Sequence, residues 1–310
     1  MNVIDRLLDK SIVFSFDKSG FERHRASFAD PELRVDLTGR RILVTGANSG
    51  LGFATTRALA ERGATVYMLC RSLERGEAAK AELSGDVHLE RIDVSDLGDV
   101  RRFAEEFEPD HVDVLIHNAG VLPNSRTLTP DGLEQTWATN VVGPFLLTHL
   151  MRSRLAASDD ARVINVSSGG MYTTRLTTSD TRWEQRDFDG VQAYAETKRA
   201  EVVLTEQWAE RLAPEGIAVH ATHPGWADTP GVKTSIPRFH QMTKHRLRTW
   251  EQGADTTVWL AASPEVRGVS GKFYFDRKEA PTHIVERTKE TASQRDALWA
   301  RCCEDAGIEV

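Results

Sequence analysis

The strongest constraint on the fold is an alternation of short apolar runs with helical stretches, which begins at Arg41 and continues to residue 275. Alternation of strands with helices of roughly ten to fifteen residues is typical of βαβ units. Their crossovers are right-handed, so we expect a doubly wound parallel sheet between two helical layers. The expected strands are 41–44, 65–69, 87–92, 112–116, 162–166, 217–222 and 272–275, and the expected helices are 53–62, 74–83, 97–107, 132–155, 191–212 and 251–262.

These elements form one expected domain, residues 39–276, with an N-terminal extension at 1–38 and a C-terminal one at 277–310. No linker or internal repeat divides the domain. Two long stretches, 171–193 and 226–249, contain no expected strand. Because ligands of such sheets bind at the carboxyl ends of the strands, we expect both stretches to serve the site.

The two extensions are expected to pack on the domain. The N-terminal one has apolar residues at helical spacing and then an aromatic patch: Val3, Ile4, Leu7, Leu8 and Ile12, then Phe14, Phe16, Phe21 and Phe28. An alternative for it is weak contact with a membrane surface, or a place beside the substrate entrance. The C-terminal one predicts an amphipathic helix with Leu298, Trp299 and Cys302 on one side.

Composition excludes several classes of function. The net charge of −7 argues against a general nucleic-acid-binding protein. The cysteines Cys70, Cys302 and Cys303 do not form a secreted disulfide pattern, and no metal-ligand spacing of Cys and His occurs. The sequence contains no run of 18 apolar residues that would predict a membrane span, and its acidic N-terminus is a poor secretory signal. We therefore expect a cytoplasmic protein. Since metal-ligand spacing is absent, we expect no bound metal.

A glycine-rich turn follows the first expected strand. Gly46, Gly50 and Gly52 lie between that strand and a helix, where a dinucleotide's pyrophosphate can approach the free N–H groups of the helix N-terminus. The spacing, G-x-x-x-G-x-G, differs from the common G-x-G-x-x-G. An ordinary glycine-rich loop is the alternative, but the place in the βαβ series favours a cofactor.

The end of the second expected strand indicates which cofactor binds. An acidic residue there would accept hydrogen bonds from the ribose of NAD, but this chain has Cys70 followed by Arg71. Arginine can pair with the 2′-phosphate of NADP in a bidentate manner. We therefore expect NADP(H) to be preferred, with NAD(H) as the alternative.

The pentapeptide Tyr194–Lys198 supplies a candidate acid and base. Four residues apart on a helix, the phenol and the ammonium share one face. An ammonium beside a phenol lowers the phenol's pKa from about 10 toward working pH, which makes the phenol a usable proton donor or acceptor. Alone, this spacing is common in helices.

Together these motifs resemble the classical short-chain dehydrogenase/reductase family, whose fold is a Rossmann fold. The resemblance covers residues 38–276 and rests on TGANSGLG (45–52), IDVSD (92–96), HNAG (117–120), TNVVGPF (139–145), VSSGG (166–170), YAETK (194–198) and HPGWADTP (223–230). His117 stands where the family has asparagine. CRSLERGEAA (70–79), the segment from Ser167 to Asp180 and LW at 298–299 are similar to its retinol-dehydrogenase-like branch.

The resemblance implies an oxidoreductase acting on a CH–OH group with NAD(P)+ as acceptor, and a small, lipophilic carbonyl or alcohol substrate. It implies Asn140, Ser168, Tyr194 and Lys198 as catalytic residues, Tyr194 as general acid or base. Tyr194 and Lys198 would also contact the cofactor. The other implied cofactor residues are Gly46, Asn48, Ser49, Gly50, Leu51, Gly52, Arg71, Asp93, Val94, Asn118, Ala119, Gly120, Pro224, Gly225 and Thr229.

Substrate contacts are expected from Trp183, Phe188 and Trp226, although Trp183 could instead be a packing anchor. The resemblance also suggests dimers or tetramers through helices near 132–157 and 191–213, unless the extensions cover those surfaces. The alternative function is an NADP-binding sensor or scaffold without turnover. A methyltransferase would share the glycine turn but not HNAG or Y-x-x-x-K, and His223 is expected to be structural.

Overall fold

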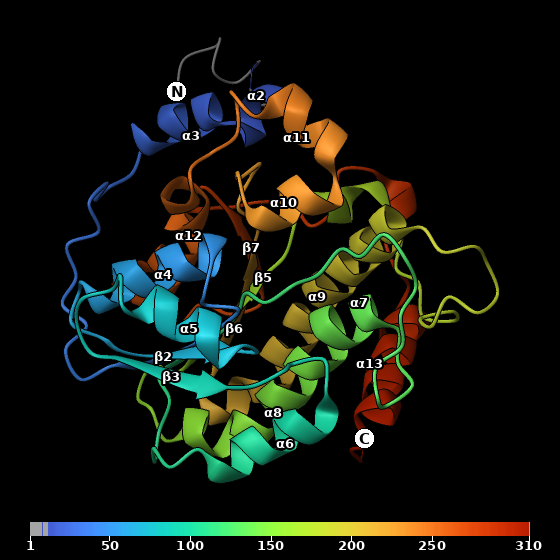
Figure 1. Ribbon diagram of the computed structural model, residues 1–310, viewed down its shortest axis with the longest axis horizontal. Helices are drawn as coiled ribbons and strands as arrows, with labels where there is room; N and C mark the ends of the chain where they lie inside the picture. The colour runs from blue at the N-terminus through green and yellow to red at the C-terminus, as the bar shows by residue number, and fades with distance from the viewer. Residues whose placement is uncertain (1–7, 9–11, 310) are drawn as a thin grey trace.

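The computed structural model describes residue 8 and residues 12–309, and an eight-stranded sheet lies at its centre (Figure 1). The strand order is β3-β2-β1-β4-β5-β6-β7-β8. All neighbours are parallel except β8, which runs antiparallel to β7. The predicted doubly wound sheet is therefore confirmed, while β8 was not predicted. The strands are β1 Arg41–Thr45, β2 Thr65–Cys70, β3 Val87–Arg91, β4 Val114–His117, β5 Arg162–Val166, β6 Ala218–Thr222, β7 Lys272–Phe275 and β8 Lys278–Glu279.

Helices cover both faces of the sheet. Strands β4 and β5 are buried along their lengths and β1 is buried after its first residue, as a sheet covered on both sides requires. The helices are α2 Ile12–Phe16, α3 Lys18–Arg25, α4 Gly50–Ala60, α5 Leu73–Lys80, α6 Leu97–Glu106, α7 Gln135–Trp137, α8 Gly143–Ala156, α9 Gly190–Leu212, α10 Pro230–Ser235, α11 Pro237–Thr243, α12 Trp250–Ala262 and α13 Ala292–Ala306. One core joins the sheet to α6, α8, α9 and α13, and a second joins it to α4 and α12.

The strand order reverses direction beside β1. This strand pairs with β2 on one side and with β4 on the other. The connections after β1 and β4 leave in opposite directions, so a crevice opens between them at the carboxyl ends of the strands. The glycine turn follows β1 and the HNAG segment follows β4, so the fold brings both motifs to this crevice.

The helix expected over 132–155 is interrupted. A turn of π-helix, Ala138–Val142, separates α7 from α8. Such turns insert an extra residue into the helix and are frequent at functional sites. Here the turn contains Asn140, which is fully buried. The close packing of Gly143 fixes the position of this segment, because a Cβ there would lie 1.8 Å from the Val94 carbonyl oxygen.

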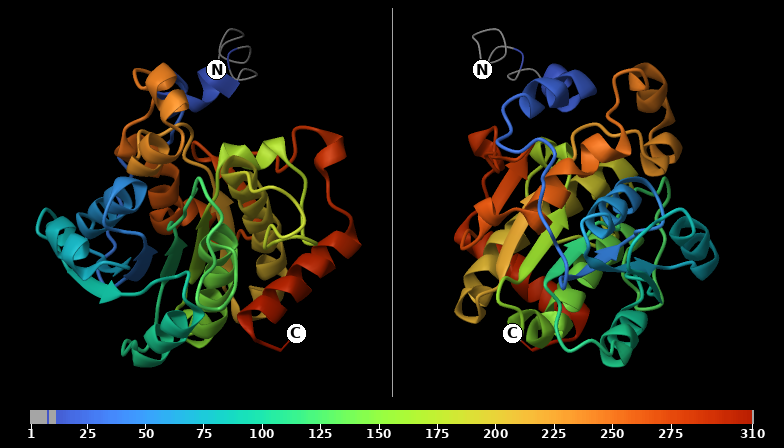
Figure 2. Two further views of the ribbon diagram at one scale, coloured as in Figure 1. Left: turned by 45° about the vertical axis from the view of Figure 1, so that its right-hand side comes forward. Right: turned by 90° about the vertical axis from the view of Figure 1, so that its left-hand side faces the viewer.

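The N-terminal helices lie at the same end of the molecule as α10 and α11, which belong to the predicted strandless stretch 226–249 (Figure 1; Figure 2 shows the same pairing from two sides). The arm packs on the domain through Phe16 and Phe21, which are buried, whereas Phe14 is exposed. The predicted helical spacing from Val3 to Leu7 lies outside the described residues.

The C-terminal helix α13 lies against α8 and α9 (Figure 2). Leu298, Trp299 and Cys302 are buried on one side, as the sequence predicted for an amphipathic helix. The Trp299 ring packs 4.9 Å from Phe145 and 4.7 Å from Trp208, measured between ring centroids. This helix therefore occupies part of the α8 and α9 surface that the family resemblance implies for subunit contacts. Within residue 8 and residues 12–309, none of the helices has the length and apolar character that crossing a membrane demands.

Candidate active site

A cavity of about 640 Å³ opens at the carboxyl ends of the parallel strands. It extends from the glycine turn after β1 past the segments after β2, β4, β5 and β6 to helices α10 and α11. Every residue predicted for the cofactor lines it except Gly52, and so do Ser168, Tyr194, Lys198 and Trp226. The fold thus brings to one cavity motifs that are up to 183 positions apart (Gly46 to Thr229: 229 − 46 = 183).

The glycine turn depends on two features that a side chain would disturb. Gly46 and Gly50 have φ of 65° and 57°, in the left-handed region that favours glycine. A Cβ at Gly52 would lie 2.4 Å from the Gly46 carbonyl oxygen, so this glycine lets α4 pack under the turn rather than line the cavity. The turn is also tied to the next motif, because the Asn118 side chain donates to the Thr45 carbonyl at 2.9 Å.

Two arginines lie where the second strand ends. Arg71 directly follows β2, its guanidinium is more than half exposed, and one nitrogen lies 3.7 Å from the Asp93 carboxylate. Ser72 and Arg75 also line the cavity, and both were missed from the sequence. Ser72 caps α5 by accepting from the Arg75 backbone N–H at 3.3 Å. Arg75 lies four positions after Arg71, in the first turn of α5, and this closeness in sequence is the signal that could have identified the second cation.

Helix α9 presents the predicted acid–base pair. It begins at a cap in which the Asp189 carboxylate accepts from the backbone N–H groups of Val191 and Gln192, at 2.9 and 3.1 Å. The Lys198 ammonium is buried 5.4 Å from the centroid of the Tyr194 ring.

The lysine is held as a cation. Its Nζ donates to the Val166 carbonyl at 2.9 Å and to the Glu201 carboxylate at 2.6 Å. Burial lowers the pKa of Lys198, but the charges of Glu201 and Tyr194 outweigh burial and raise it overall. The ammonium form therefore persists beside the phenol.

The two adjacent serines after β5 differ in their contacts. Ser167 is buried, and its hydroxyl donates to the Lys198 carbonyl at 2.9 Å, which ties the strand to α9. Ser168 is half-buried, and its hydroxyl oxygen accepts from the Gly170 N–H at 3.2 Å. Ser168 is therefore the serine whose hydroxyl can meet a ligand in the cavity.

Asn140 lies behind the cavity and joins two walls of it. Its amide oxygen accepts from the Val121 N–H at 2.9 Å, and its amide nitrogen donates to the Thr197 hydroxyl at 2.9 Å. A Cβ on Gly120 would lie 3.5 Å from the Asn140 oxygen and 3.4 Å from Lys198 Nζ. Asn140 therefore holds the HNAG loop against α9, close to the lysine.

The loop after β6 is held by the N-terminal arm, for which the sequence offered a place beside the substrate entrance as an alternative to packing on the domain. The Trp226 N–H donates to the Phe16 carbonyl at 2.8 Å. The centroid of the Phe16 ring lies 4.6 Å from that of the His223 ring. The Phe16 ring also packs against Gly169, next to Ser168, since a Cβ on Gly169 would lie 2.6 Å from a carbon of the Phe16 ring.

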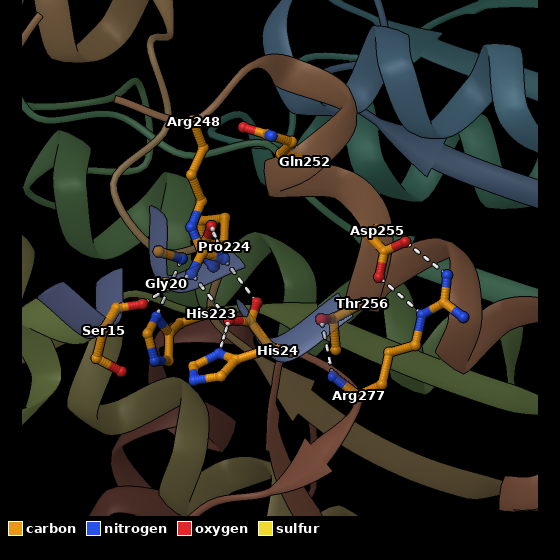
Figure 3. Close-up of polar contacts among 12 residues, drawn as sticks. Ser15, Gly20, His24, His223, Pro224, Arg248, Gln252, Asp255, Thr256 and Arg277 are labelled. Carbon is orange, nitrogen blue, oxygen red and sulfur yellow. Dashed lines mark hydrogen bonds and ion pairs between the residues drawn. The ribbon is translucent and has the colours of Figure 1, made fainter. Parts of the chain in front are cut away.

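A buried ionic cluster fixes this arrangement (Figure 3). Arg248 is paired with Asp276 at 2.6 and 2.8 Å, and it donates to the carbonyls of Ser15 and Pro224 at 3.0 and 3.3 Å. His24 contacts the same carboxylate at 2.6 Å. Burial would raise the pKa of Asp276, but the His24 hydrogen bond and the Arg248 charge outweigh burial and lower it.

Three aromatic or imidazole side chains singled out in the sequence lie away from the cavity. Trp183 is buried, packs 5.4 Å from Phe188 and lies under the Arg186 guanidinium, so its position is that of a packing anchor. Neither ring lines the cavity, and their predicted substrate contact gains no support here. His223 stacks on Phe275 at 4.1 Å, and burial lowers its pKa to about 3, which fits the structural role expected for it.

A parallel sheet with a dinucleotide turn, and a tyrosine and lysine at its crevice, define an oxidoreductase of the short-chain dehydrogenase/reductase family. The family model described as short chain dehydrogenase matches residues 40–238, and the chain belongs to this family.

Individual relatives agree with this assignment. The chain is 45% identical over 291 residues to dehydrogenase/reductase SDR family member 12 of Bos taurus, covering 91% of each chain. It is 36% identical over 283 residues to retinol dehydrogenase 12 of Homo sapiens, covering 88% of each. Among solved structures, an uncharacterized protein from Mycobacterium Paratuberculosis matches with a TM-score of 0.73 at 32% identity, over 89% of this chain and 96% of that one.

Proposed function

We propose that this protein is an NADP(H)-dependent oxidoreductase that interconverts a carbonyl and an alcohol on a lipophilic small molecule, with Tyr194 as general acid or base. The observation that carries the proposal is the shared cavity: Tyr194, Lys198 and Ser168 line the same space as the glycine turn. A phenol beside a buried ammonium and a serine hydroxyl is a set of groups suited to moving a proton to or from a substrate oxygen.

The cavity fits a dinucleotide with a 2′-phosphate. The turn has positive φ at Gly46 and Gly50 and lies at the N-terminus of α4, where free N–H groups attract pyrophosphate. Arg71 and Arg75 supply two cations at the end of β2, where a ribose phosphate would lie. A bound nicotinamide would supply the hydride, and the residues of the chain would bind, orient and protonate.

Each side chain has a role that follows from its contacts. In reduction, the Tyr194 hydroxyl would donate its proton to the substrate oxygen while the Ser168 hydroxyl stabilises the developing charge. The Lys198 ammonium favours the ionised phenol that remains. Asn140 would hold the HNAG loop in a fixed position against α9. Oxidation is the reverse sequence, in which Tyr194 accepts the proton.

The far end of the cavity favours a lipophilic substrate. Away from the glycine turn its walls include Thr173 and Ser235 and a larger set of apolar side chains: Leu122, Val191, Trp226, Val232, Ile236 and Phe239. Apolar walls with few polar groups are typical of sites that bury the apolar part of a ligand. A relative named retinol dehydrogenase supports the same substrate class.

The test is NADPH consumption over a panel of aldehydes, retinoids, steroids and quinones. Tyr194→Phe should bind NADPH as the wild type does, by thermal shift, and should lose about 10²–10⁴-fold in turnover. Tyr172→Phe is the matched control, because the Tyr172 hydroxyl donates to the Pro281 carbonyl, away from the cavity lining. Unchanged turnover in Tyr194→Phe would exclude the proposed acid, and NADPH binding without turnover of any compound would favour a sensor.

A further inference from the structure

Glu201 is a buried carboxylate in direct contact with the lysine of the site. It lies on α9 three residues after Lys198, and its side chain is 9% exposed. One carboxylate oxygen accepts from Lys198 Nζ at 2.6 Å. The other, Oε2, is buried and has no hydrogen-bond partner among the residues that the structure describes. A buried carboxylate oxygen without a partner is costly, and a bound proton lowers that cost by removing the charge.

A second, small cavity lies beside this carboxylate. It has a volume of about 10 Å³, close to the room that one water molecule needs. Its polar walls are Asn140, Thr148 and Asn165, and the rest is apolar. A water in this cavity would have Asn140, Thr148 and Asn165 as polar neighbours, and it would hydrogen-bond the free Glu201 oxygen.

The charged and titratable groups around Glu201 are few. On its own helix they are Lys198 and, through the lysine, Tyr194. Thr148 of α8 lines the small cavity, and its hydroxyl lies 2.8 Å from Nε2 of His117 on β4. Burial lowers the pKa of His117 to about 3, so this imidazole is neutral at working pH. Asn140 and Asn165, from the π-helical turn and from β5, do not titrate. The charge next to Lys198 is therefore set by Glu201.

The balance of burial and pairing leaves Glu201 able to titrate near neutrality. Burial raises the pKa of Glu201 to about 7, and the Lys198 ammonium opposes this rise. When the carboxylate is ionised, it and the lysine sum to zero charge. When it takes up a proton from solvent, the pair carries one positive charge, which favours the ionised form of a nearby phenol.

We propose that Glu201 is a positioning residue that acts through Lys198: it fixes the ammonium in place and, by gaining or losing a proton, switches the charge beside Tyr194 between positive and zero. This inference rests on the function proposed above. An ionised Glu201 favours the phenol, the form that donates a proton in carbonyl reduction. A protonated Glu201 favours the phenolate, the form that accepts one in alcohol oxidation. The pH dependence of the two directions would thus contain an ionisation that belongs to neither Tyr194 nor the substrate.

The test compares Glu201→Gln, Glu201→Asp and Glu210→Gln, the last a control at an exposed position of the same helix. Glutamine keeps an oxygen that accepts from Lys198 Nζ but cannot titrate. The pH profiles of NADPH oxidation and NADP reduction in the wild type should show an ionisation near pH 7. It should be absent from Glu201→Gln, present but displaced in Glu201→Asp, and unchanged in Glu210→Gln.

Infrared spectroscopy gives a readout that does not need turnover. The wild type minus Glu201→Gln difference spectrum should contain a protonated-carboxyl band that disappears as the pH rises through about 7. If Glu201→Gln does not fold, the pH titration of the wild-type band and the Glu201→Asp profile make the same test.

The outcomes separate the two proposals. Tyr194-dependent turnover with the same pH profile in Glu201→Gln, or a carboxyl band that does not titrate near pH 7, would overturn the role of Glu201 alone. Absence of turnover in the wild type would overturn the proposed function and the role of Glu201 together.

Discussion

Replacement of Arg248 by methionine tests whether the N-terminal arm is an integral part of the wall of the cavity. Arg248 is almost fully buried and donates to Asp276, to two carbonyls of the arm and to the carbonyl of Pro224. Methionine fills much of the same volume but supplies no donor. Asp276, itself 3% exposed, would then remain buried with His24 as its remaining partner in the cluster.

The expected cost follows from the burial of this pair. Removing one partner of a buried ion pair costs about 3–5 kcal/mol, because the other charge stays desolvated. With an unfolding entropy of about 2.1 cal/mol/K per residue over 310 residues, this loss lowers Tm by roughly 5–8 °C. Arg246 provides the contrast: it contacts Asp17 at 3.2 Å and is 44% exposed, and Asp17, itself 2% exposed, keeps its bonds from the Ser19 hydroxyl and the Gly20 N–H when Arg246 is removed. Arg246→Met should cost less than about 1 kcal/mol.

Urea unfolding followed by circular dichroism measures both costs, and limited proteolysis reports on the arm. Arg248→Met should be cleaved faster within residues 14–25 than the wild type or Arg246→Met. Combining it with Asp276→Asn should cost less than the sum of the two single changes, because the buried charge is gone. A loss below about 1 kcal/mol for Arg248→Met, or strictly additive costs, would refute the reasoning.

Three further predictions concern other parts of the molecule. Arg71→Ala should raise the Kd of NADPH about 10–100-fold, because one charge-assisted contact is lost, and should raise the Kd of NADH less than about threefold. Calorimetric titration measures both constants. Equal effects on the two cofactors would remove the argument that Arg71 binds the 2′-phosphate. The pKa of Glu201 is near 7 in the folded chain, against an ordinary value of 4.5. Proton binding by Glu201 therefore contributes to the free energy of unfolding, fully below about pH 4.5, and this contribution is lost as the pH rises through about 7. Wild type should therefore lose about 3 kcal/mol relative to Glu201→Gln across that range in urea unfolding, and parallel pH curves would contradict this. Trp299→Ala should cost about 3–5 kcal/mol in the same assay, since its ring fills the space between Phe145 and Trp208, and a cost below 1 kcal/mol would mean that α13 is loosely docked.

The fold was predictable because its signals are local. Each buried strand is a short apolar run and each helix has its own periodicity, so the order of elements suffices to predict a parallel sheet. The positions of Gly46 and Ser168 at one cavity follow in turn, since β1 and β5 end at the same edge of the sheet, and Tyr194 reaches that edge near the start of α9. Arg75 was not predicted to line the cavity, although it lies only four positions after Arg71.

The remaining features depend on contacts between distant segments. The pairing of Arg248 with the arm joins residues 231 and 233 positions apart, and no periodicity encodes such a contact. The π-helical turn at Asn140 consists entirely of buried residues, and in such a segment tertiary packing can override local propensity. Glu201 could be seen from the sequence to share a helix with Lys198, but its burial beside the lysine required the position of the sheet.

Helix α13 has a consequence for how helix α9 is supported. The aromatic side chain of Trp299 rests on Trp208 of α9, which also carries Tyr194 and Lys198. A segment tethered to its own docking surface is present there at an effective concentration on the order of millimolar, whatever the protein concentration. This support is therefore insensitive to dilution, so α13 should stay docked on α9 in nanomolar and micromolar solutions of the protein alike.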